Sequence, residues 1–121
     1  MDRRAVRDRA NAAALRGDKV GVCMPVVAEL WYGVENSATR KRNAQRLRSA
    51  LRELVIWPFD IASAEEYGRL AAHLRRVGRP MQQIDIMIAA VALSLGNTTV
   101  VSSDSDFAVV PNLTVENWAT S

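Results

Sequence analysis

One segment of the chain is apolar on every side, and it constrains the fold more than any other. Residues 84–95 read IDIMIAAVALSL and are followed by Gly96. An apolar run of this length, ended by a glycine, predicts a helix over about residues 83–95. A helix without a polar face has to be covered by other elements, so we expect this one at the centre of the domain.

Around this helix, short β-branched runs alternate with segments of helical pattern. Strands are expected over residues 20–24, 54–57, 98–102 and 113–116, and helices over residues 3–16, 26–36, 39–53, 63–77 and 83–95. Ser63-Ala-Glu-Glu66 has the form of a capping box that opens the fourth helix. Strands that alternate with helices predict an α/β fold, with a mostly parallel sheet and helices on both of its faces.

Four acidic side chains stand at predicted junctions of strands and helices. Glu29 lies one turn into the helix after the first predicted strand, and Asp85 lies in the first turn of the apolar helix. Asp104 and Asp106 follow the strand 98–102. Ligands of open α/β sheets bind at the carboxyl ends of the strands. A carboxylate among apolar neighbours, as at Glu29, is costly to bury without a partner, and the helix dipole should keep Asp85 ionised.

Carboxylates gathered in this way predict a site for a cation. They repel one another and raise one another's pKa unless a cation neutralises them. Ligands that are all oxygen favour Mg²⁺ or Mn²⁺ over zinc, and such an ion in a basic protein points to phosphodiester chemistry. Two plainer interpretations stay open. Asp104 and Asp106 have the pattern of turn residues, and Asp85 that of a residue chosen for a helix start.

Several motifs together resemble a known family. AELWYG, a Gly-Arg-Pro turn before IDIMIAAVAL, VVSSDSDF and PNLTVENW occur in the order and spacing of the PIN-domain ribonucleases, and most closely resemble the VapC toxins of bacterial toxin–antitoxin pairs. The resemblance implies one PIN-like domain over residues 1–121, with three layers, α/β/α. It also implies an endoribonuclease that depends on Mg²⁺ or Mn²⁺, a cognate antitoxin and a homodimer. The implied metal ligands are Glu29, Asp85, Asp104 and Asp106, with Ser102 in support.

The chain departs from the family pattern at its beginning. The family opens with an apolar strand that ends in Asp-Thr or Asp-Ser and supplies the first metal ligand, and nothing before Val20 has this form. A misplaced start, a truncation or a true loss would each explain the difference. Without that strand, we expect the edges of strands 20–24 and 98–102 to be open to pairing. The alternative function is a degenerate, non-catalytic PIN-like module that binds the antitoxin or dimerises.

The positive charge is concentrated in the helix predicted over residues 39–53. Candidate RNA-binding residues there are Arg40, Lys41, Arg42 and Arg46, and Arg79 precedes the apolar helix. An apolar stripe on the opposite side predicts that one face packs and the other faces solvent. Such a face would attract the phosphates of RNA, with binding that depends on salt. A solubilising surface and a docking site for the antitoxin are the alternatives.

Length and composition fit a cytoplasmic globular domain. The chain has 121 residues, of which 49% are hydrophobic, and it carries a net charge of +3. The longest apolar run is shorter than the ~20 residues of a membrane span, and the N-terminal arginines precede no apolar segment of a signal peptide. Cys23 is the single cysteine, so an internal disulfide is excluded, and we expect it to be a buried strand residue.

Overall fold

The computed structural model describes residues 3–119, which form five α-helices, a 3₁₀ helix and four short strands. In chain order these are α1 Arg3–Leu15, β1 Gly21–Cys23, α2 Met24–Glu35, α3 Arg40–Arg52, β2 Val55–Trp57, α4 Ile61–Arg76, α5 Gln83–Leu95, β3 Thr99–Val101, the 3₁₀ helix η1 Ser105–Val109 and β4 Thr114–Glu116. All predicted helices and strands are present, which confirms the α/β class. The 3₁₀ helix was not predicted.

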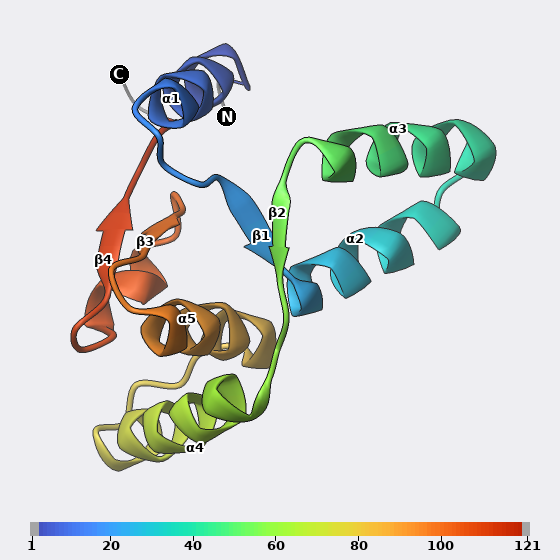
Figure 1. The fold of residues 1–121 in the computed structure, drawn as a ribbon. Coiled ribbons are helices and arrows are strands. Elements are labelled where there is room, and N and C mark those ends of the chain that lie inside the picture. The colour runs from blue at the N-terminus through green and yellow to red at the C-terminus, as the bar shows by residue number, and fades with distance from the viewer. Residues whose placement is uncertain (1–2, 120–121) are drawn as a thin grey trace.

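The strands form two parallel pairs (Figure 1). β1 pairs with β2 with Val22 beside Ile56, and β3 pairs with β4 with Val100 beside Val115. Within residues 3–119, no strand joins the two pairs. The parallel direction was predicted correctly, but a single sheet is not formed by the described residues. β1 and β3 each keep one open edge, as expected.

Helix α5 occupies the centre of the fold, with the bounds that the sequence predicts. Ala89 and Ala90 are fully inaccessible to solvent. Helix α4 packs along α5 (Figure 1), and their contact belongs to one core that also includes residues of β3 and η1. Its buried members are Leu70, Leu74, Ile86, Ala89, Ala92, Val100, Phe107 and Val110. Among the described residues, no helix has the length and apolar character that crossing a membrane requires.

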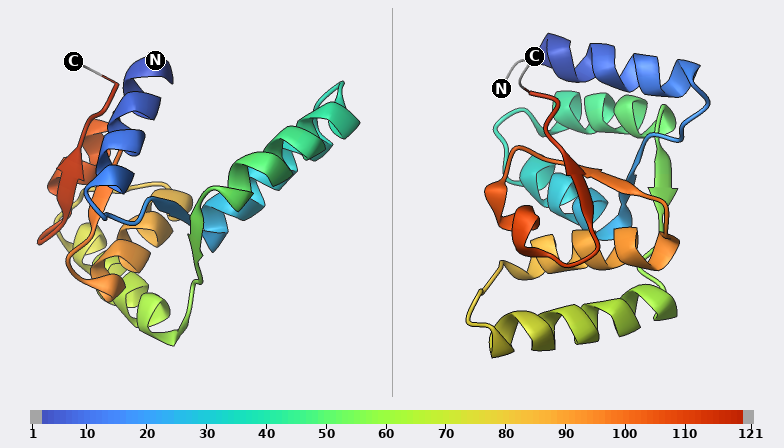
Figure 2. Two further views of the ribbon diagram at one scale, coloured as in Figure 1. Left: turned by 45° about the horizontal axis from the view of Figure 1, so that its top comes forward. Right: turned by 90° about the vertical axis from the view of Figure 1, so that its left-hand side faces the viewer.

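Helices α2 and α3 form a hairpin that projects from the rest of the domain (Figure 2). Helix α3 contacts α2 and the start of β2, and none of its residues is fully buried. Its apolar stripe is partly covered, whereas its basic side chains face solvent. The predicted division of this helix into a packing face and a charged face is therefore confirmed.

Helix α1 lies next to the segment that follows β4, as Figure 1 shows. The guanidinium of Arg9 lies 3.5 Å from a carboxylate oxygen of Glu116 and 5.6 Å from the centre of the Trp118 ring. These contacts connect the first helix to the last residue of β4 and to the segment that follows it. They are largely exposed, so each contributes little on its own.

Helix α4 begins earlier than predicted, and a different residue caps it. The helix starts at Ile61, and the carboxylate of Asp60 accepts hydrogen bonds from the backbone N–H and the hydroxyl of Ser63, both at 2.9 Å. The prediction of a capping box opening at Ser63 is therefore wrong. Ser63 lies inside the first turn, where its hydroxyl is buried 3.2 Å from that of Ser94 on α5.

Replacing Asp60 with alanine is expected to lower the melting temperature at pH 7 by about 3–6 °C, because the α4 cap is lost. The same hydrogen bonds lower the pKa of Asp60 from its ordinary 3.8. The folded pKa lies below the unfolded one, so the stabilisation is complete above the unfolded pKa and is lost as pH falls through the folded pKa. Melting curves of both proteins between pH 7 and pH 2 should therefore converge in acid. An equal difference at every pH would contradict the assignment of the cap.

Candidate metal centre

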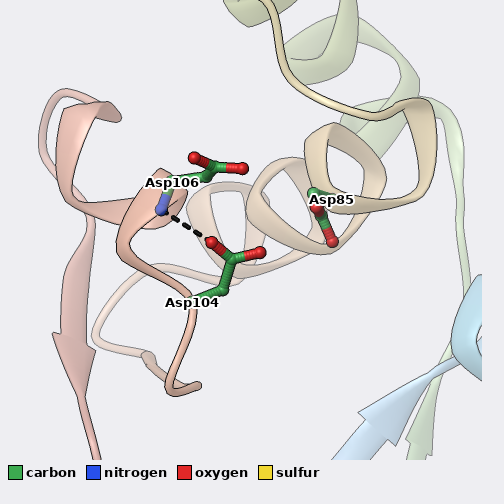
Figure 3. A group of neighbouring side chains, drawn as sticks. All are labelled: Asp85, Asp104 and Asp106. Atoms are coloured by element: carbon green, nitrogen blue, oxygen red, sulfur yellow. Dashed lines mark hydrogen bonds between the residues drawn. The ribbon is translucent and has the colours of Figure 1, made fainter.

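Three carboxylates meet beside the first turn of α5. Asp85, Asp104 and Asp106 each place a carboxylate oxygen within 4.8 Å of the others (Figure 3). Asp85 lies in α5, Asp104 immediately precedes η1, and Asp106 lies in its first turn. Asp85 is partly buried, and the other two are exposed. A cation bound here would have ligands from two elements that are remote in sequence.

The turn after β3 holds Asp104 and Asp106 through a chain of hydrogen bonds. The backbone N–H of Ser102 donates to the carbonyl of Glu116 at 3.0 Å, which extends the pairing of β3 with β4. The hydroxyl of Ser102 accepts from the N–H of Asp104 at 3.0 Å, and Asp104 accepts from the N–H of Asp106 at 2.9 Å. Phe107 anchors η1 in the core. Asp104 is thus both a turn residue and a member of the acidic group.

The three charges act on one another. The pKa of Asp85 is raised from its ordinary 3.8, first by burial and then by the negative charges of Asp104 and Asp106. Burial and repulsion by the neighbouring carboxylates disfavour the ionised form, which opposes the effect predicted for the helix dipole. That Asp85 is ionised at neutral pH stays a prediction. The predicted mutual repulsion is present. A divalent cation would relieve it, and an all-oxygen set of ligands suits Mg²⁺ or Mn²⁺.

The structure brings together three of the four predicted ligands, and Glu29 is not in the group. Glu29 is exposed on α2 and lines a pocket that also involves Phe59, Gln82 and Gln83. Its role as a ligand stays a prediction. Phe59, Gln82 and Gln83 were not among the predicted site residues. Their positions in the sequence could have indicated them, since Phe59 follows β2 and the two glutamines stand at the start of the central helix.

The candidate RNA-binding residues lie on the exposed surface. Arg40, Lys41, Arg42 and Arg46 are exposed on α3, and Arg79 is exposed before α5. Arg40 lies 3.9 Å from Glu35. The guanidinium of Arg48 lies 5.3 Å from the centre of the Trp31 ring, so this tryptophan is partly covered by an arginine of the neighbouring helix.

Comparison with known proteins gives consistent matches over most of the chain. Residues 2–113 match the PIN domain family. The tRNA(fMet)-specific endonuclease VapC of Shigella flexneri is 32% identical over 115 residues, which are 95% of this chain and 85% of that protein.

Solved structures give the same result. VapBC2 from Rickettsia felis, bound to a DNA fragment of its promoter, superposes with a TM-score of 0.87 at 30% identity, over 93% of this chain and 84% of that one. DNA-bound VapBC from Salmonella typhimurium has a TM-score of 0.87 at 29% identity, over 94% and 84%. These likenesses confirm the predicted PIN-like α/β/α fold.

Proposed function

The chain belongs to the VapC family of PIN-domain ribonuclease toxins, and from this we propose that it hydrolyses RNA with a divalent cation held by Asp85, Asp104 and Asp106. The observation that carries the proposal is the convergence of these carboxylates within 4.8 Å. The cation, Mg²⁺ or Mn²⁺, would activate a water molecule and stabilise the charge on the scissile phosphate. We include Glu29 as a further ligand, and the expected products carry a 5′-phosphate and a 3′-hydroxyl.

The partners of this activity follow from the family. The solved neighbours are complexes of a VapC toxin with its VapB antitoxin, which supports a cognate antitoxin for this chain. A homodimer inside such a complex is part of the proposal. The Shigella relative is named as specific for tRNA(fMet), so we propose transfer RNA as the first substrate to test.

The role of Ser102 in holding the turn that carries Asp104 can be tested directly. Replacing Ser102 with alanine is expected to reduce cleavage about tenfold, because the hydroxyl that accepts from the N–H of Asp104 is lost. Ser102→Thr keeps a hydroxyl and should retain most of the activity. Initial rates of both variants decide the question. Equal rates for the alanine variant and the unaltered chain would contradict the role.

We propose that the basic side chains of α3 and Arg79 contact RNA phosphates. Arg42→Ala and Arg46→Ala are expected to weaken the binding of all RNAs to a similar extent, about threefold to tenfold each, since phosphate contacts do not depend on sequence. The slope of log K against log salt should fall by about one for each arginine that is replaced. Fluorescence anisotropy at several salt concentrations measures both quantities. Arg16→Ala, on the loop after α1, is the control, and an unchanged salt slope in the α3 variants would refute this assignment.

Cleavage of a mixed RNA pool, transfer RNA included, tests the proposed function. We expect cleavage by the folded chain with Mg²⁺ or Mn²⁺ and none with EDTA. Cleavage that persists in EDTA would contradict the metal site. Silence under all conditions would instead support the non-catalytic binding module, which the converging acidic side chains do not favour.

A further inference from the structure

A pocket of about 690 Å³ opens at the carboxyl ends of β1 and β2. Met24 begins α2 directly after β1, and Phe59 follows β2 by two residues. Gln82 and Gln83 contribute from the start of α5, and Met87 from its next turn. The volume lies within the range of about 300–1,000 Å³ that is usual for sites of small ligands. The pocket lies at the carboxyl ends of parallel strands, which is where α/β folds bind their ligands.

The pocket and the acidic group are both connected to the first turn of α5. Gln83 and Ile84 line it, and the next residue is Asp85. The first turn of α5 therefore carries both a wall of the pocket and a member of the three-carboxylate group. A substrate whose phosphate lay at the carboxylates would have its neighbouring groups within reach of the pocket.

The lining selects the kind of group that fits. It is mainly apolar, with two amides and the carboxylate of Glu29, and the described residues that line it include no cation. Phe59 offers a ring on which a base can stack, and methionine side chains adapt to flat ligands. The amides of Gln82 and Gln83 can both donate to and accept from the edge of a base.

Two of these side chains are already positioned for such contacts. The ring of Phe59 is partly exposed and lies edge-on to Tyr67, with centres 6.3 Å apart and planes at 75°, which supports it from behind. Gln82 is the N-cap residue of α5, yet its side chain makes no capping hydrogen bond. Replacing the side chain of Gln82 therefore removes no capping hydrogen bond from α5.

We propose that this pocket receives one unpaired nucleobase of the RNA next to the cleaved phosphate, and that it selects the base. The inference rests on the proposed function and deepens it. The base stacks on Phe59, and Gln82 and Gln83 bind its edge. The pocket thus requires a single-stranded position in the substrate, such as a loop, where a base is free to leave its stack.

The test measures the binding of labelled eight-nucleotide RNAs in EDTA by fluorescence anisotropy. The probes are the four homopolymers and an oligonucleotide without bases. The unaltered chain should prefer one homopolymer, and Phe59→Leu should weaken that binding about tenfold while leaving the abasic probe unaffected. Phe59→Tyr keeps the ring and should retain the affinity. Gln82→Ala combined with Gln83→Ala should reduce the preference among bases. Tyr32→Leu, which changes an exposed aromatic residue outside the pocket, is the matched control.

Each contrary outcome has a separate meaning. Equal binding by Phe59→Leu and the unaltered chain would overturn the pocket proposal, even if metal-dependent cleavage is found. A change from dimer to monomer in Phe59→Leu, measured by light scattering with RNA binding unchanged, would also overturn it and assign the pocket to a contact between two copies. No binding of any RNA by the unaltered chain would overturn the pocket proposal, and cleavage of the RNA pool with Mg²⁺ or Mn²⁺ tests the proposed function separately.

Discussion

Replacing Asp85 with asparagine is expected to reduce the rate of RNA cleavage by at least about 100-fold. Removing a group that only supports a metal ligand lowers activity about 10- to 100-fold, and loss of the ligand itself should lower it further. The variant keeps the shape of the side chain and removes its charge. Asp18→Asn is the matched control, because Asp18 is exposed and lies outside the acidic group. Cleavage by Asp85→Asn at the unaltered rate would contradict the site.

The same substitution is expected to stabilise the protein in the absence of metal. The folded pKa of Asp85 is raised above its unfolded value, so ionising this carboxyl destabilises the native state. The destabilisation is absent below the unfolded pKa and is complete once pH exceeds the folded pKa. At pH 7 asparagine removes this cost, and the melting temperature should rise by about 1–3 °C. Added Mn²⁺ should stabilise the unaltered chain more than the variant. A lower melting temperature for Asp85→Asn in EDTA would contradict the repulsion among the three carboxylates.

Replacing Gly21 with alanine is expected to destabilise the fold by about 2–3 kcal/mol, the cost of forcing an atom into a filled site. A β-carbon at Gly21 would collide with the backbone carbonyl of Val55 and would lie 2.7 Å from a ring atom of Trp57. The β1–β2 pair would have to separate, and this pair leads into α2 and the pocket. Denaturation by urea measures the destabilisation.

Gly33→Ala is the matched control for this substitution. Gly33 lies in α2, and a β-carbon there would meet no atom within 4 Å. The change should stabilise the helix by up to about 1 kcal/mol, because alanine is the better helix former. Similar effects of the two substitutions would contradict the close approach of β1 and β2.

The parts of the fold that depend on local pattern were predictable from the sequence. The bounds of α5 match because an apolar run ended by glycine leaves little choice of conformation or place. The start of α4 was predicted wrongly, since Asp60 and Ser63 both have side chains suited to capping. Only the observed hydrogen bonds decide between them. The open edges of β1 and β3 followed from the sequence, because no apolar run before Val20 offers a strand to lie between them.

The three members of the acidic group were among the four ligands that the sequence suggested, but their geometry was not predictable. Asp104 and Asp106 are close in sequence and share a turn, so their proximity followed from local structure. Their meeting with Asp85, and its raised pKa, depend on how η1 packs against α5. The effect predicted for the helix dipole left out burial, which is the first cause of the raised pKa, whereas the repulsion among the carboxylates was predicted. The position of Glu29 outside the three-carboxylate group likewise depends on the tertiary arrangement of α2.

The most direct test of the account is a calorimetric titration of the folded protein with Mn²⁺. The unaltered chain should bind the ion, and Asp85→Asn, Asp104→Asn and Asp106→Asn should each weaken the affinity about tenfold or more, whereas Asp18→Asn should not. Glu29→Gln, titrated beside them, shows whether that residue joins the ligands. Equal affinity in the unaltered chain and in all three variants would contradict the claim that these carboxylates form the metal centre.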